Sequence, residues 1–124
     1  MTWSNILAVF IGSGLGGVCR YLCSRGIQAL APHAAFPWST FAVNLIGCFI
    51  IGLLYGLFDK SNILSPELRL LLTVGFCGGF TTFSTFINES YMLSGANLLM
   101  SLGYLLASVA GGFLMLYLAY KLVV

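Results

Sequence analysis

The sequence predicts an all-α integral membrane protein with four transmembrane helices in a single domain, residues 1–124. Hydrophobic residues make up 60% of the 124 residues and charged residues only 6%, whereas about a quarter of a soluble domain is charged. The mean hydropathy is +1.02. Because a bilayer-spanning helix needs roughly 20 mostly apolar residues, the chain holds four such helices and leaves no room for a soluble domain.

Charged and turn-forming residues separate the four apolar segments. The breaks run from Arg25 to Pro37, from Asp59 to Glu67 and around Gly95. With four spans, both termini lie on one side of the membrane. The predicted helices cover residues of about 4–25, 38–58, 68–93 and 97–121.

Basic residues are shared almost evenly between the two sides of the predicted bundle. Lys60, Arg69 and Lys121 fall on the side of the termini, and Arg20 and Arg25 on the other. The charge bias that normally fixes orientation is therefore close to zero, so insertion in both orientations is expected. A polar path through so small a subunit needs a partner, and an inverted copy would supply one. The sequence thus favours an antiparallel homodimer.

Two classes of site are excluded by composition. The net charge of +2 comes without any basic cluster, which argues against nucleic-acid binding. The four cysteines lie inside apolar stretches without a Cys-x-x-Cys pair, and there is one His, so neither a zinc site nor a disulfide framework is expected.

The third segment carries polar residues where a span should be apolar. Three glycines and four hydroxyl residues lie between Gly75 and Phe86, and this cluster predicts a broken helix, which at this depth is tolerated only inside protein or beside a water-filled cavity. Exposed carbonyls would suit a hard cation, whereas freed amides and hydroxyls would suit an anion. The alternative is a regular helix in which Thr and Ser bond to their own carbonyls.

Phe83 and Phe86 lie three residues apart and so on nearby faces of one helix, with Ser84 and Thr85 between them. The positive edge of an aromatic ring can stabilise a dehydrated anion without a trapping cation. The alternative role is packing or lipid contact.

Polar residues in the second and fourth spans have similar alternatives. Asn44 offers two amide donors to an anion or an interhelical hydrogen bond. Tyr104 and Ser108 share one helix face, with Gly112 following at the same spacing. They could form a row of donors for an anion. Alternatively, Tyr104 anchors the helix at the membrane interface and the Ser108 hydroxyl bonds its own backbone.

Two charged residues fall near membrane depth. Glu89 is a candidate proton carrier, although its place a turn past Phe86 favours a hydrated vestibule. Arg20 would snorkel to the surface or attract anions. A structural role is at least as well supported for each.

Three stretches together resemble the bacterial Fluc (CrcB) fluoride channels, over nearly the whole chain. They are residues 75–86, the Gly/Arg stretch 16–21, and the Asn-containing stretch 40–47. The resemblance implies a passive fluoride channel of the bacterial cytoplasmic membrane, not an enzyme, assembled as a dual-topology homodimer with two antiparallel pores. It would let a cell lose fluoride that enters as hydrogen fluoride and ionises in the cytoplasm.

The resemblance also assigns roles to residues. A structural Na⁺ at the dimer centre would be held by the backbone carbonyls of Gly78 and Thr81. Gly112 stands where some relatives carry Ser, so the last donor of the row is in doubt. The vestibule or structural positions are Arg20, Thr40 and Glu89. The fluoride contacts are Asn44, Phe83, Ser84, Thr85, Phe86, Tyr104 and Ser108.

Two other functions are weaker alternatives. A small dual-topology proton-coupled multidrug exporter would need a carboxylate inside the first span, which has none. A non-transporting membrane assembly protein would explain small residues at helical spacing, such as Gly12 and Gly16. It would not explain the hydroxyl cluster in the third span.

Overall fold

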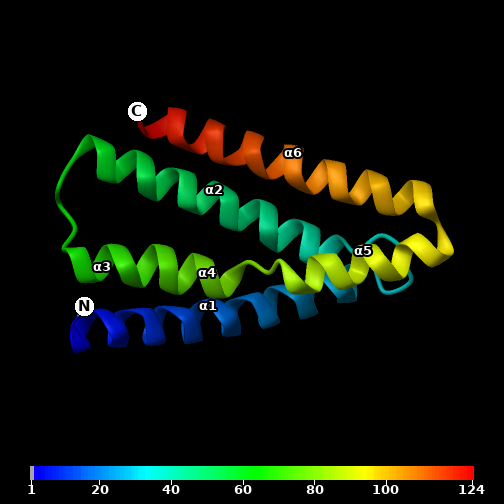
Figure 1. Cartoon of the computed structure of the whole chain (residues 1–124), viewed down its shortest axis with the longest axis horizontal. Coiled ribbons are helices and arrows are strands. Elements are labelled where there is room, and N and C mark those ends of the chain that lie inside the picture. The colour runs from blue at the N-terminus through cyan, green and yellow to red at the C-terminus, as the bar shows by residue number, and fades with distance from the viewer. Residues whose placement is uncertain (1) are drawn as a thin grey trace.

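The computed structural model describes residues 2–124, so Met1, the first residue of the predicted domain, lies outside the described part. Within that part the chain forms four long helical segments that run side by side, with both termini and the α2–α3 loop at one end (Figure 1). The first, second and last segments are α1 (Trp3–Leu30), α2 (Trp38–Lys60) and α6 (Leu98–Val123). The third segment is composite: α3 (Pro66–Leu70), η1 (Leu71–Cys77), α4 (Gly78–Phe80) and α5 (Ser84–Ala96).

All four segments are long and apolar enough to cross a membrane. The first is longer than the predicted 4–25, because Arg25 does not end it. The Arg25 guanidinium donates a hydrogen bond of 3.2 Å to the Tyr21 hydroxyl one turn earlier, and α1 continues to Leu30. It ends at Leu30, because Pro32 disfavours helical backbone at the preceding residue, Ala31.

Side-chain caps mark three of the helix starts. Thr2 Oγ1 accepts from the Asn5 amide at 3.3 Å, and Asn97 Oδ1 accepts from the Met100 amide at 3.0 Å. Ser65 Oγ accepts from the Leu68 amide at 3.2 Å, directly before Pro66. These contacts satisfy amides that have no partner within the helix, as Ser, Thr and Asn caps commonly do.

Glycines bring α1 into backbone contact with the third segment. A Cβ added to Gly12 would lie 2.2 Å from the Leu71 carbonyl oxygen, and one added to Gly16 would lie 2.1 Å from the Phe76 carbonyl oxygen. These glycines therefore serve close helix packing, which drives association in lipid.

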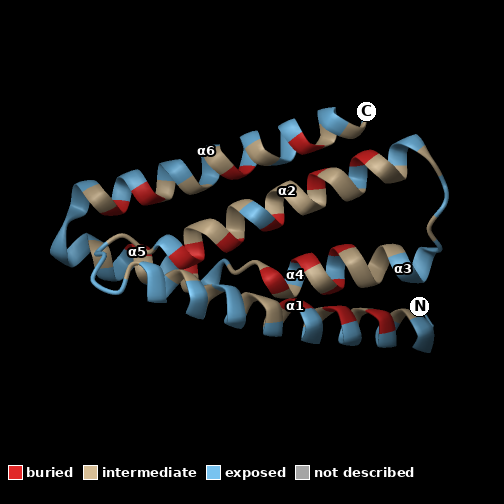
Figure 2. Ribbon diagram, turned by 180° about the vertical axis from the view of Figure 1, so that it is seen from behind, coloured by how far each residue is buried: buried red, intermediate tan, exposed pale blue. Residues whose placement is uncertain are grey.

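The outward faces of the helices are apolar and exposed, whereas the buried residues lie where helices face one another (Figure 2). Phe10 is 76% exposed and Phe113 79%. Large side chains of this kind on most of the outer surface match a lipid environment rather than water.

The α1 contact generates a matched test of the packing. Gly12→Ala is expected to lower the unfolding free energy by about 1–3 kcal/mol, because the methyl group would overlap backbone of η1. Gly14→Ala on the same helix is the control, since within residues 2–124 no heavy atom outside its own helical turns lies within 4 Å of its added Cβ. Thermal unfolding in detergent should separate the two variants, and equal midpoints would contradict the packing described.

Candidate functional site

The third segment is interrupted at residues 81–83, between α4 and α5, where Figure 1 shows a short non-helical connection. Thr81 is extended, with φ −91° and ψ 162°. Its hydroxyl does bond the Cys77 carbonyl at 2.9 Å, as the regular-helix alternative expected, but the backbone still leaves the helix. The predicted break is therefore present. Nothing in the sequence predicts the π-helical turns of η1 just before it.

Side chains take over two of the helical hydrogen bonds at the break. The Thr82 amide donates to Asn44 Oδ1 at 2.8 Å, and Asn44 Nδ2 donates to the Thr82 carbonyl at 3.0 Å. In a continuous helix that amide would bond the Gly78 carbonyl. Likewise, the Thr85 amide donates to Thr82 Oγ1 at 3.3 Å rather than to the Thr81 carbonyl. The carbonyls of Gly78 and Thr81 thus lose their helical donors.

A third contact ties α1 to the same region. Arg20 Nε donates to the Gly79 carbonyl at 3.1 Å. A Cβ added to Gly79 would lie 2.5 Å from the Ser13 carbonyl oxygen, so the small residue permits the close approach. Arg20 therefore has a structural role at the break.

The central groove, of about 610 Å³, runs along the break on the side of α2 and α6. Of the described residues that line it, none carries a charge. The predicted site residues among them are Asn44, Gly78, Thr81, Phe83, Phe86 and Ser108.

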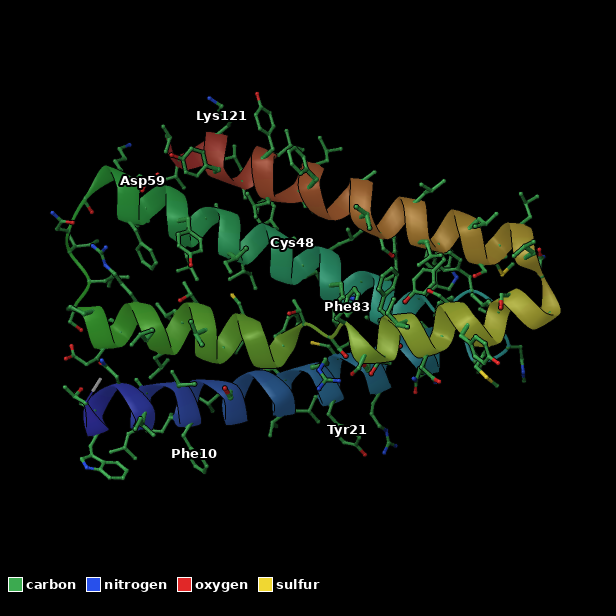
Figure 3. The ribbon with its side chains drawn as sticks, in the orientation of Figure 1. Phe10, Tyr21, Cys48, Asp59, Phe83 and Lys121 are labelled. Atoms are coloured by element: carbon green, nitrogen blue, oxygen red, sulfur yellow. The ribbon has the colours of Figure 1, made fainter. Side chains whose placement is uncertain are left out.

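The two phenylalanines lie in different surroundings. Phe83 is 73% exposed and is the last residue of the break, directly before α5 (Figure 3), so the prediction that both rings project from one helix is only approximate. Phe86 is buried, with its ring centre 6.0 Å from that of Phe83. It meets the Tyr104 ring at 5.0 Å and 75°, an edge-to-face contact that fixes its orientation.

Tyr104 and Ser108 do not form one continuous row of donors. Tyr104 is fully buried, and its hydroxyl donates to Glu89 Oε1 at 3.0 Å. Thr40 Oγ1 donates to the other carboxylate oxygen at 3.0 Å, so Glu89 links α2, α5 and α6. Ser108 lines the central groove, and its hydroxyl has no hydrogen-bond partner within residues 2–124.

A second, polar groove of about 310 Å³ is lined by residues of α1, α2, the break and α5. It is lined by the three predicted vestibule or structural residues, Arg20, Thr40 and Glu89, and also by Thr85, which was predicted as a fluoride contact. Thr82 lines both grooves. Ser84, by contrast, is exposed and lines neither of them.

Thr82 joins several contacts of the break, although it is not among the predicted site residues. It bonds Asn44 through its backbone and Thr85 through its hydroxyl. Its position three residues before Thr85 is typical of a helix-capping hydroxyl, and that spacing could have identified it.

The Asn44 contact generates a test of the break. Asn44→Ala removes two hydrogen bonds and leaves the Thr82 backbone unsatisfied, so the unfolding free energy should fall by about 1–3 kcal/mol. Asn88→Ala is the control, because Asn88 is an exposed amide on α5. Denaturation in a mild detergent would measure both. An Asn44 variant as stable as the Asn88 variant would mean that the pair does not hold the break.

Comparisons with known proteins agree on one family. The family described as CrcB-like protein, Camphor Resistance (CrcB), matches residues 7–120. The "Fluoride-specific ion channel FluC" of Serratia proteamaculans is 46% identical over 122 residues, covering 98% of this chain and 94% of that protein. The protein of the same name from Phocaeicola vulgatus is 46% identical over 111 residues, covering 89% and 90%. That from Geobacter sulfurreducens is 51% identical over 90 residues, covering 73% and 72%. The chain belongs to the CrcB family.

Proposed function

We propose that the protein is a fluoride-specific channel of the bacterial cytoplasmic membrane, through which fluoride leaves the cell down its electrochemical gradient. The relatives bear the name of fluoride-specific channels, and one observation carries the proposal on the structural side. Among the described residues, the central groove combines polar donors and aromatic rings without a charged side chain.

Neutral donors suit conduction of a small anion. A fixed cation would bind fluoride too tightly for it to leave, whereas neutral groups replace only part of its hydration. Asn44 uses one amide hydrogen on Thr82 and keeps the other, and Ser108 keeps its hydroxyl hydrogen. The rings of Phe83 and Phe86 add positive edges.

The polar groove would serve as a mouth of this path. Arg20 lies there with Thr40, Thr85 and Glu89, and its positive charge offsets the negative charge of Glu89, which would otherwise repel an anion. Thr82 lines both grooves, so an ion passing from one to the other would cross the break. Tyr104 orients two residues of the path: its ring packs against Phe86 and its hydroxyl donates to Glu89.

The finer proposal is that the channel is an antiparallel homodimer. The central groove is open along one side, and Phe83 is 73% exposed. A second copy would cover both, and the even distribution of basic residues permits an inverted one. Ser84, which lies outside both grooves, would reach fluoride only where the second copy completes the path.

The Na⁺ site is the other finer proposal. The residues fit such an ion, because carbonyl oxygens are suitable ligands for a hard cation in a broken membrane helix, and those of Gly78 and Thr81 have lost their helical donors. Both residues line the central groove, and an inverted copy packed over it would present the same pair. A bound cation would neutralise the carbonyl dipoles of both copies.

Fluoride release from liposomes that contain only this protein tests the function. Wild type is expected to release fluoride and not chloride, and Phe83→Ile should reduce fluoride release by at least about tenfold, because the aliphatic side chain lacks a positive edge. Phe113→Ile is the control, since Phe113 is equally exposed but lies on the outer face of α6. Wild-type liposomes that retain fluoride would overturn the proposal.

Replacement of Na⁺ tests the dimer and the cation site together. Exchange of Na⁺ for N-methylglucamine should shift the purified protein from dimer to monomer, because unpaired carbonyl dipoles would then face one another. Crosslinking in detergent would follow the shift, with K⁺ as a second replacement. A dimer that is indifferent to the cation would remove the Na⁺ site, and a monomer in Na⁺ would remove the dimer.

A further inference from the structure

The polar face of α6 is incomplete in this chain. Tyr104, Ser108 and Gly112 follow one another at four-residue spacing. The Tyr104 hydroxyl donates to Glu89, whereas Ser108 lines the central groove and its buried hydroxyl has no hydrogen-bond partner in the described chain. Gly112 is buried and has no side chain. On α6 itself, the donors therefore end at Ser108.

A thiol from α2 occupies the space beside Gly112. A Cβ added to Gly112 would lie 3.1 Å from Cys48 Sγ, and within residues 2–124 no other heavy atom outside its own helical turns comes within 4 Å. Cys48 lies near the middle of α2 (Figure 3) and lines the central groove, as Asn44 does one turn earlier. The sulfur thus stands where a side chain at residue 112 would project.

We propose that the Cys48 thiol is a fluoride contact. After Ser108 on α6, the next hydrogen-bond donor along the path is then this thiol on α2, which takes the place of a side chain at Gly112. This inference rests on the proposed function. A thiol is a neutral and weak hydrogen-bond donor, so it assists a partly hydrated anion without holding it. Such a contact affects both the rate and the choice of anion.

Packing alone makes a different prediction. A buried cysteine often acts as a small hydrophobe, and Cys48 is half-buried beside the close α2–α6 contact. In that case only its volume matters, and Ser would be a worse replacement than Ala because of its hydroxyl. For a fluoride contact the order is reversed, since Ser keeps a donor and Ala does not.

Fluoride release from liposomes can separate the two roles. Cys48→Ala should slow fluoride release by about fivefold, the loss of one weak donor, whereas Cys48→Ser should keep at least the wild-type rate. The double variant Cys48→Ala with Gly112→Ser should restore the rate to within about twofold of wild type, because removal of the sulfur leaves room for a donor on α6. Cys19→Ala is the control, since Cys19 lies on α1 and lines neither groove.

Ser108→Ala makes the outcomes distinguishable. If this variant slows release and Cys48→Ala does not, the inference is wrong while the proposed function stands. If Cys48→Ser is as slow as Cys48→Ala, and the double variant is not rescued, Cys48 acts through packing. If wild type releases no fluoride, the inference and the proposed function both fail. Dimer content by size-exclusion chromatography should be equal in all variants.

Discussion

The reciprocal hydrogen bonds between Asn44 and Thr82 are the constraint on which the rest of the site depends. Inside a membrane no water satisfies an open backbone, so a helix can break only where protein groups replace the lost bonds. The Asn44 side chain accepts from the Thr82 amide and donates to its carbonyl. With Thr82 held in this way, the Gly78 and Thr81 carbonyls lose their helical donors, and Phe83 is left at the exposed edge of the break.

The two grooves beside the break differ in charge. The polar groove contains Arg20 and Glu89, whereas the described lining of the central groove carries no charge. Glycine contacts between α1 and η1 bring Arg20 close enough to bond the Gly79 carbonyl. The glycine packing of α1 therefore determines both where Arg20 contacts the broken backbone and where its charge lies relative to the proposed path.

Much of this fold could be predicted from the sequence, because apolar length sets the number of spans and a cluster of glycines and hydroxyls indicates a break. The partners of individual side chains could not. Helical spacing places Tyr104 and Ser108 on one face, but only tertiary packing turns the Tyr104 hydroxyl towards Glu89. The contact of Cys48 with Gly112 arises between helices and leaves no local pattern. The sequence does not predict the extension of α1 to Leu30, because a charged residue such as Arg25 usually ends an apolar span, whereas here its side chain folds back along the helix to Tyr21.

The most direct measurement of the central claim is the backbone conformation of Thr81 in lipid. Solid-state NMR of the protein in lipid bilayers, with ¹³C-labelled threonine, reports extended or helical backbone from the Cα and carbonyl shifts. Wild type is expected to show extended values at Thr81, whereas Asn44→Ala, which leaves the Thr82 backbone without its partner, should broaden or split that resonance. Helical values at Thr81 in the wild-type protein would contradict the broken third segment, and with it the origin proposed for both ion sites.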